Sequence, residues 1–454
     1  MRANFLSCAG LCAGALFLSP SIALANMGNT ATTYGLLPTD IASAQALSMF
    51  NTQVSAVYYN PAYLTKDPRG ELTMGLLHAD HELRATSLGG ANPPNRSGGD
   101  VLQDSPSQHT LIGLKTDLSS LTKLNHPIFF GVMIGVEQYG EEMLAFESQT
   151  SREGQYFEYG RQPLFLNLGG ATTLWRGIDV GASARITLHS EAELVATTNL
   201  AGDTQYEELN VSAKPSIRPI LSATVDMAET FCPDNEGCWL DGFETAFAFR
   251  GYSNTNTTVD AQTVIPGTIA PPGLNLKVTT LDSYQPNIYS AGLLYGGERF
   301  RVGASVEMQQ WSELEEEFDS DTIKDQAVNS NVGTLAFQDI VVPRLGAEYQ
   351  LNDNFMLTGG VAYSESPLES NASLDVNYLD ADKWIVGLGL TAKYKETRFL
   401  AFPVRFDLAY QYQKLESREF DLYATNSPTF PQPYETVEAD GDVHVFSGSV
   451  TLKF

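Results

Sequence analysis

The last eleven residues, His444 to Phe454, alternate strictly between two kinds of side chain. Counting back in twos from Phe454 gives Leu452, Val450, Gly448 and Phe446, and the intervening residues are Lys453, Thr451, Ser449 and Ser447. Such alternation predicts a β-strand with one apolar and one polar face. The same pattern recurs along most of the chain, without helical runs that could cover the apolar faces. Lipid is the environment that all these strands could share, so we interpret them as parts of a membrane barrel.

The first 25 residues are typical of a secretion signal. Arg2 supplies the positive charge, Phe5 to Leu18 is a short apolar run, and Ala23-Leu24-Ala25 is a cleavage site. Cys8 and Cys12 could instead suggest a lipoprotein anchor, but neither is well placed for one. We therefore expect residues 1–25 to be a cleaved signal peptide.

After the signal, the chain lacks the ~18–20 consecutive apolar residues that a membrane helix needs. The mature chain is therefore either a soluble exported protein or a β-barrel, whose strands expose only one face to lipid. The barrel interpretation places it in the outer membrane of a Gram-negative bacterium, in contact with membrane lipids. We expect a monomer.

The formal net charge of -27 argues against nucleic acid as a partner, because nucleic-acid-binding proteins concentrate Lys and Arg. Acidic residues gather between Glu313 and Asp325, in one predicted loop. Carboxylate oxygens suit calcium, but the run lacks a defined ligand spacing with a turn glycine. A solvated loop is the favoured interpretation, and neither a metal nor a cofactor is expected.

Two cysteines remain after removal of the signal, Cys232 and Cys238. In an oxidising compartment this spacing predicts a local disulfide across one turn.

The alternation predicts about fourteen antiparallel strands from Gly70 onward, an even number as a single-chain barrel needs. The predicted strands are 71–84, 108–118, 127–146, 156–174, 178–195, 207–228, 242–255, 281–296, 299–316, 339–351, 355–367, 383–395, 403–421 and 442–454. Short turns alternate with long polar connectors, for which we predict the ranges 85–107, 256–280, 317–338 and 422–441. We expect the short turns on the periplasmic side and the long loops outside.

Residues 26–69 do not share the strand period. Residues Ile41–Phe50 could form one short helix with Asp40 as its N-cap. The segment could be a plug inside the barrel or a periplasmic appendage, and its apolar content favours the plug. We therefore divide the chain into a signal (1–25), an N-terminal hatch (26–69) and a transmembrane β-barrel (70–454).

Several motifs resemble the FadL/TodX family of outer-membrane transporters for long-chain fatty acids and hydrocarbons. The turn Asn60-Pro61-Ala62 after Val57-Tyr58-Tyr59 is similar to the turn in the family's hatch. Further downstream, the resembling stretches are Gln310–Leu314, Leu345–Tyr349, Gly360–Pro367 and Asp380–Trp384. Tyr63 stands where family members often have Gly, and Lys383 where they have Arg. These departures bear on the ligand more than on the fold.

The resemblance implies passive uptake of a hydrophobic small molecule. The molecule would enter an apolar pocket in the barrel, the hatch would shift, and a kink in the third strand would give a lateral exit. In this chain the residues that could form such an opening are Gly140, Glu141 and Glu142, although they could also simply lie above the membrane.

Several positions predicted to face the lumen are apolar, which is unusual for a water-filled pore. They could pack against the plug, the favoured interpretation, or form the wall of a ligand pocket. These candidates are Phe129, Met133, Phe165, Leu294, Met356 and Ile385.

Charged residues share the lumen-facing positions and must pair if the barrel is plugged. Structural ion pairs are the favoured interpretation, and an arginine that binds a substrate carboxylate is the alternative. The arginines are Arg185, Arg218, Arg250, Arg301, Arg344 and Arg405, and the acids are Glu244, Glu307, Glu348 and Asp407.

None of the six histidines lies in a motif with a nucleophilic serine, so we do not expect an enzyme. Uptake of long-chain fatty acids or other hydrophobic compounds is the main hypothesis. A general porin, or a structural or adhesion barrel, is the alternative.

Overall fold

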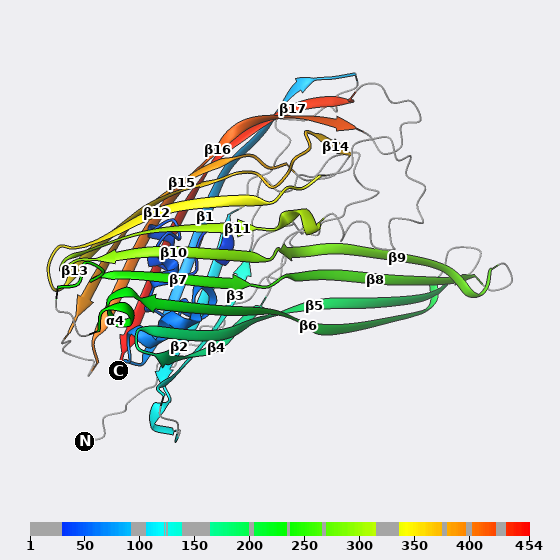
Figure 1. The fold of residues 1–454 in the computed structure, drawn as a ribbon. Coiled ribbons are helices and arrows are strands. Elements are labelled where there is room, and N and C mark those ends of the chain that lie inside the picture. Colours follow the sequence, from blue (N-terminus) through cyan, green and yellow to red (C-terminus); the bar gives the residue numbers. More distant parts are fainter. Residues whose placement is uncertain are drawn as a thin grey trace, which may run out of the picture.

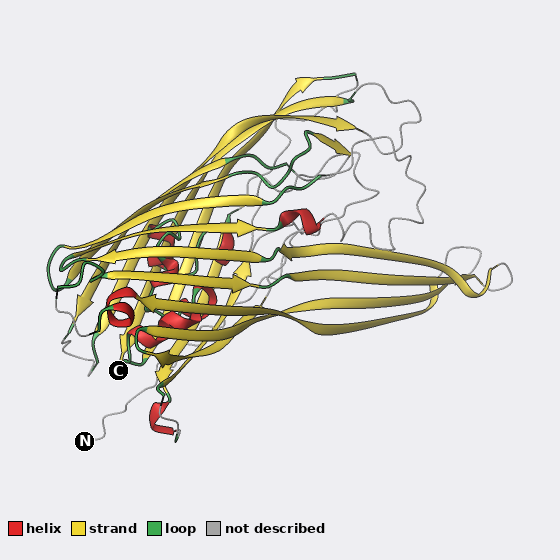
Figure 2. Cartoon of the chain, viewed as in Figure 1, coloured by secondary structure: helices red, strands yellow, loops and turns green. Residues whose placement is uncertain are grey.

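A computed structural model describes residues 30–91, 106–121, 123, 126–138, 164–198, 204–233, 237–265, 269–314, 336–374, 379–395, 402–423 and 433–454. One sheet of 17 strands dominates it (Figures 1 and 2). Fourteen of these strands pair antiparallel in chain order, and the first pairs with the last, so the sheet closes into a barrel. The barrel strands are β1 (Glu71–Gly89), β2 (Ser107–Asp117), β3 (Ile128–Gln138), β4 (Leu164–Trp175), β5 (Ile178–Thr198), β6 (Thr204–Asp226), β7 (Phe243–Arg250), β10 (Ile288–Gly296), β11 (Phe300–Gln309), β12 (Ile340–Gln350), β13 (Phe355–Ser364), β15 (Lys383–Tyr394), β16 (Val404–Tyr423) and β17 (Glu435–Lys453). The prediction of a fourteen-stranded antiparallel barrel is confirmed.

Large apolar side chains cover the outside of the barrel wall. Leu408 on β16 and Phe247 on β7 are 63% and 56% exposed, whereas their inward neighbours Asp407 and Ala246 are buried. Period-2 alternation thus sorts the side chains into a lipid-facing and a lumen-facing set. No helix in the described part of the chain is long and apolar enough to cross a membrane.

Residues 30–66 lie inside the barrel (Figure 2); we call this segment the plug. Its short helical elements are α1 (Thr30–Thr33), α2 (Pro38–Ala42), η1 (Ser48–Phe50), α3 (Ala56–Tyr59) and η2 (Pro61–Lys66). Nearly all of its residues are buried against the lumen wall.

The single helix predicted over 41–50 is wrong. α2 ends at Ala42, and Ala44 and Gln45 take positive φ angles of 49° and 65° before η1 begins. The N-cap of α2 is Leu37, and the Asp40 carboxylate accepts a hydrogen bond from the Leu37 amide at 3.1 Å. The left-handed residues make a sharp bend where the plug meets the wall of β13 and β15.

The loop predicted over 256–280 is also wrong. This range belongs to a hairpin of β8 (Ser253–Ile265) and β9 (Ile269–Gln285), which continues β7 and β10 beyond the barrel. β8 additionally pairs in parallel with the outer part of β5. A further short strand, β14 (Ala372–Leu374), pairs in parallel with β16.

Three short helical elements lie in the connections: η3 (Ser119–Leu121), α4 (Met227–Phe231) and η4 (Trp311–Glu313). The predicted disulfide between Cys232 and Cys238 is present directly after α4, in the connection from β6 to β7. The predicted signal peptide lies outside the described residues.

Candidate functional site

The hatch turn predicted from sequence is a tight contact between plug and wall. The Asn60 side-chain amide donates to the Met49 carbonyl at 2.7 Å and to Thr224 Oγ1 on β6 at 2.9 Å. The Ala62 amide donates to Ser222 Oγ at 2.9 Å, and Pro61 begins η2. The turn therefore joins two parts of the plug and attaches them to β6.

Further hydrogen bonds connect the plug with other strands. Lys115 on β2 donates to the Thr52 carbonyl at 2.6 Å, and the Val54 amide donates to Glu71 Oε1 at 2.5 Å. Two strands from β1, Gln411 of β16 donates to two plug carbonyls, Tyr34 O at 3.2 Å and Ile41 O at 2.9 Å. The plug is thus held around the circumference of the barrel.

Glycines in the wall allow the plug backbone to come close. A Cβ built on Gly360 of β13 would overlap the Ser43 carbonyl, and one on Gly387 of β15 would overlap the Ile41 carbonyl. A glycine is required at both positions because any side chain would displace the plug.

The lumen arginines mostly form structural ion pairs. Arg344 lies 3.2 Å from Glu307, which also pairs with Arg250, and Arg185 lies 2.8 Å from Glu137. Two further pairs are Arg301–Glu348 at 3.0 Å and Arg405–Asp407 at 2.9 Å. Glu244 lies 3.8 Å from Lys66 of the plug.

Arg218 has a different role from the one its charge predicted. It donates to the Gly251 carbonyl at 2.5 Å and to the Pro286 carbonyl at 2.7 Å. These two residues lie where β7 gives way to β8 and β9 gives way to β10. A third bond reaches Tyr58 of the plug at 3.3 Å. Arg218 thus connects the break between β7 and β8 with the break between β9 and β10, and it links both to the plug.

Most of the predicted pocket residues pack against the plug. Phe129, Met133 and Phe165 belong to a buried cluster with plug residues such as Val57 and Tyr59. Leu294 is buried in a second cluster, which includes Leu47, Met49 and Phe50 of the plug. Met356 is half-buried at the lumen-facing register of β13. A ligand contact for these residues remains a prediction.

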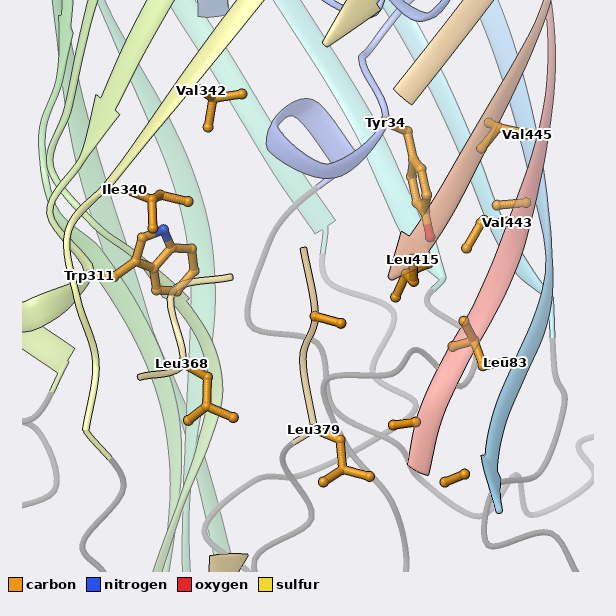
Figure 3. Close-up of a cluster of buried hydrophobic side chains, with 14 of the residues drawn as sticks. Tyr34, Leu83, Trp311, Ile340, Val342, Leu368, Leu379, Leu415, Val443 and Val445 are labelled. Carbon is orange, nitrogen blue, oxygen red and sulfur yellow. The ribbon is translucent and has the colours of Figure 1, made fainter. Parts of the chain in front are cut away.

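Ile385 is the predicted pocket residue that lines a cavity beside Thr32–Tyr34, at one end of the plug. The centre of a water-sized sphere can occupy about 90 Å³ within the cavity, which is partly open to solvent. Figure 3 shows Trp311 and Ile340 on one side of this space, and Leu83, Leu415 and Val443 on the other. We call this cavity and its lining the chamber.

The chamber is mainly apolar. Its lining residues Trp311, Ile340, Ile385, Leu415 and Val443 are each at most 6% exposed. They belong to buried clusters that lie near the ends of β11, β12 and β15 and in the middle of β16 and β17. Leu83, Ile340, Leu415 and Val443 were not among the pocket residues predicted from the sequence. The available signal was that lumen-facing positions of β17 change from polar at Thr451 and Ser449 to apolar at Val445 and Val443.

Two cations line the chamber, and each has an acidic neighbour. Arg344 pairs with Glu307, and Lys383 lies near Asp380, which also faces the chamber. Burial raises the pKa of the Asp380 carboxyl above 3.8, while the positive charge of Lys383 and a hydrogen bond from Ser366 oppose that rise. Each positive charge in the lining therefore has a carboxylate beside it, and the surface around these charges is mainly apolar.

Two of the stretches that resemble the family, Ser366-Pro367 and Asp380-Ala381-Asp382, meet beside the chamber. Ser366 Oγ donates to Asp380 Oδ2 at 2.8 Å, and the Ser366 amide donates to Asp382 Oδ1 at 2.8 Å. Arg418 of β16 donates to the Leu368 carbonyl at 2.8 Å and to the Asp380 carbonyl at 3.3 Å. These bonds fix the connection from β13 to β15 as part of the chamber wall.

The candidate lateral opening cannot be placed in the same way. Gly140, Glu141 and Glu142 lie outside the described residues. The described pairing of β3 with β4 reaches Val136 and Leu164.

Comparisons with known proteins agree with this architecture. Residues 250–454 match the family model described as outer membrane protein transport protein (OMPP1/FadL/TodX). Alkane uptake protein A of Marinobacter nauticus is 54% identical over 430 residues, which cover 95% of this chain and 92% of that protein.

Two solved structures share the fold at low sequence identity. A FadL homologue of Pseudomonas aeruginosa gives a TM-score of 0.58 at 15% identity and covers 95% of this chain and 99% of its own. The toluene transporter TodX of P. putida gives 0.53 at 13%, covering 93% and 99%. The barrel, the family model and the relative of nearly the same length agree: this chain is an outer-membrane β-barrel and belongs to the FadL/TodX family of outer-membrane transport proteins.

Proposed function

We propose that this protein takes up neutral long-chain hydrocarbons of the alkane class and binds them in the chamber beside the plug. The observation that carries the proposal is the chamber lining, which exposes mainly apolar surface and has its cations compensated by carboxylates. The relative named as an alkane uptake protein supports the same class of substrate.

The chemistry of the lining favours an alkane over a fatty acid. Each methylene group that leaves water for an apolar site contributes about 0.8 kcal/mol. A carboxylate would need a cation able to form a new charge-assisted hydrogen bond. Arg344 already bonds to Glu307 and to the Ala44 carbonyl, and Lys383 lies near Asp380. A fatty acid would therefore have to compete with these carboxylates.

Passage beyond the chamber requires the plug to shift, because the plug fills the adjoining lumen. The contact at Asn60-Pro61-Ala62 and the bonds from Gln411 are the ties that such a shift would break. We propose that the molecule then leaves sideways near Gly140, Glu141 and Glu142. The apolar lumen face of β3 and β4 beside the plug, with Phe129, Met133 and Phe165, supports this route.

Fluorescence of Trp311 provides a direct test of binding. Trp311 is 6% exposed at the chamber, whereas Trp175, Trp239 and Trp384 are 61%, 81% and 49% exposed. We expect 1-bromododecane to quench the wild-type protein with saturation and to lose most of this effect in Trp311→Phe. Unsaturable quenching that persists in Trp311→Phe would contradict binding in the chamber.

Uptake is tested with variants of matched chemistry. Leu415→Asp places a charge in the chamber, whereas Leu121→Asp places one on a residue of η3 that is 79% exposed. In a strain that lacks the native protein, we expect Leu415→Asp to reduce uptake of labelled hexadecane at least tenfold and Leu121→Asp to leave it unchanged. Equal uptake by both variants would contradict the proposal.

Conductance separates this function from a general porin. Because the plug is bonded around the lumen, we expect the purified protein to be almost silent in planar bilayers. A steady, large aqueous conductance would favour the porin.

A further inference from the structure

The connection between β6 and β7 begins with α4, which lies against the outer surface of the barrel. Met227 Sδ of α4 accepts a hydrogen bond from Thr245 Oγ1 on β7 at 3.9 Å. The neighbouring residue Glu244 faces the lumen, because it accepts a hydrogen bond from Tyr63 of the plug at 3.4 Å. Side chains alternate along a strand, so Thr245 faces outward. The contact therefore places α4 on the lipid-facing side of β7.

Hydrogen bonds also attach α4 to the turn between β4 and β5. The Asp226 amide donates to the Gly177 carbonyl at 2.7 Å, and Thr230 Oγ1 donates to the Arg176 carbonyl at 3.1 Å. Figure 1 shows α4 at the same end of the barrel as the C-terminus. The helix therefore lies beside the ends of β5 and β6, between the turn before β5 on one side and β7 on the other.

Two aromatic side chains of this connection are exposed next to the disulfide. Phe231 precedes Cys232 and is 65% exposed, and Trp239 follows Cys238 and is 81% exposed. The disulfide holds the Cα atoms of the two cysteines 6.5 Å apart, so the two aromatic residues are held in one region. Exposed apolar side chains gathered at one place indicate a contact surface.

Aromatic side chains form a belt on the outer surface at this end of the barrel. The ring centroids of Phe243 on β7 and Tyr295 on β10 are 4.8 Å apart, and those of Tyr295 and Phe300 on β11 are 5.9 Å apart. The belt continues with Tyr349, Tyr394, Phe406, Phe402 and Phe454. Aromatic belts of membrane proteins lie at the level of the lipid headgroups. The belt therefore marks one edge of the bilayer on this barrel.

At β5 and β6 the strands contribute no ring to this belt. Their outward positions at this end are occupied by Ile178 and Val180 on β5 and by Ala223 and Val225 on β6. The belt has Phe243 on one side of these strands, and Trp175 at the end of β4 is exposed on the other. Phe231 and Trp239 thus lie where the strands leave a gap in the belt.

We propose that Phe231 and Trp239 insert into the headgroup layer of the bilayer and bind zwitterionic phospholipid there. The short turns at this end predict that the leaflet is the periplasmic one. Continuity with the lipid-facing surface identifies the partner as lipid, and an indole N–H can donate to a lipid ester carbonyl while its ring packs on the chains. Residues 226–242 carry acidic side chains but neither Lys nor Arg, so the connection repels anionic headgroups.

Depth-dependent quenching tests the insertion. The full-length protein with Trp175, Trp311 and Trp384 each changed to Phe keeps Trp239 as its fluorophore and is placed in phosphatidylcholine nanodiscs. We expect phosphatidylcholine brominated near the headgroup to quench Trp239 about threefold more strongly than the same lipid brominated near the chain ends. The matched control keeps Trp311 in place of Trp239, and its buried ring should be quenched much less by either lipid.

The headgroup preference is tested in nanodiscs that contain equal amounts of phosphatidylcholine and anionic phosphatidylglycerol. Only one of the two lipids carries bromine near its headgroup in each sample. We expect brominated phosphatidylcholine to quench Trp239 about twofold more strongly than brominated phosphatidylglycerol, because the acidic side chains keep anionic lipid away.

Three results would overturn the proposal. The first is strong quenching of Trp239 by aqueous iodide with none by brominated lipid, because the ring would then face water and fit a periplasmic protein partner better. The second is equal quenching by the two depths of bromine, and the third is stronger quenching by phosphatidylglycerol. Migration of unboiled protein on gels verifies folding. If the triple variant does not fold, the difference between the wild type and Trp239→Phe gives the same quenching.

Discussion

The part of the lumen that the plug fills combines polar ties with apolar packing, whereas the chamber beside it exposes mainly apolar surface. Around the plug, the wall supplies polar hydrogen bonds, ion pairs and glycines that admit the plug backbone, as at Gly360 and Gly387. Around the chamber, corresponding lumen-facing positions carry apolar side chains such as Ile340 and Val443. If the chamber binds the substrate as proposed, sealing and ligand binding occupy separate levels of one barrel. A change at one level should therefore leave the other largely intact.

The largest effect is expected where the plug backbone touches the wall. Gly360→Val would overlap the Ser43 carbonyl and should force the plug away from β13. We expect steady conductance in planar bilayers and at least a tenfold rise in permeability of intact cells to vancomycin. Gly359→Val is the control, since its Cβ meets the end of the Leu388 side chain and not the plug. A silent, impermeable Gly360→Val barrel would show that the contact does not seat the plug.

Arg218→Met should have the next largest effect. It removes donors from the Gly251 and Pro286 carbonyls and from Tyr58 of the plug. Each hydrogen bond to a charged group contributes about 1.5–3 kcal/mol, so we expect a loss of at least about 3 kcal/mol in the free energy of unfolding. Guanidinium titration in detergent measures it. Arg84→Met, which breaks an exposed pair with Asp440, should cost less than about 1 kcal/mol. Similar losses in both variants would contradict a special role for Arg218.

The barrel could be predicted from the sequence because strand alternation is a local pattern. The division of the lumen into plug and chamber could not, because it depends on contacts between distant residues. Strand alternation is local, so Val404 to Tyr412 reveal a strand without knowledge of their neighbours. The hairpin of β8 and β9 contains Pro271, Pro272 and Gly273 and resembles a loop until its pairing with distant β5 is known. The bend at Ala44 and Gln45 likewise depends on wall glycines more than 300 residues away. The chamber depends on where the plug ends, which no local pattern records.

Asp380→Asn should change selectivity at the chamber with little effect on the plug. It leaves the charge of Lys383 uncompensated on the chamber lining. We expect about tenfold tighter binding of a brominated C12 sulfonate, equal to about 1.4 kcal/mol, with 1-bromododecane binding unchanged. Asp382→Asn is the control, since Asp382 instead accepts from Tyr363 and the Ser366 amide. Unchanged sulfonate binding in Asp380→Asn would contradict charge compensation.

The pH dependence of the wild type provides a second measure of the same group. Because burial raises the pKa of Asp380, its carboxyl takes up a proton at a higher pH than an exposed aspartate. As the pH falls, the wild type should therefore approach the sulfonate affinity of Asp380→Asn, while the variant changes less. The sulfonate stays ionised throughout, so its own titration does not contribute.

The smallest effect is expected at the boundary between the two levels. Gln411→Leu removes the bonds to the Tyr34 and Ile41 carbonyls, and Tyr34 belongs to both the plug and the chamber lining. At about 1 kcal/mol per bond, this should raise hydrogen exchange of plug amides about thirtyfold without opening a conducting pore. Tyr410→Phe, which loses a bond to His444 on the outer surface, is the control and should leave that exchange unchanged. If Gln411→Leu also weakens 1-bromododecane binding, the two levels are coupled through Tyr34; if it changes exchange alone, they are independent at their point of contact.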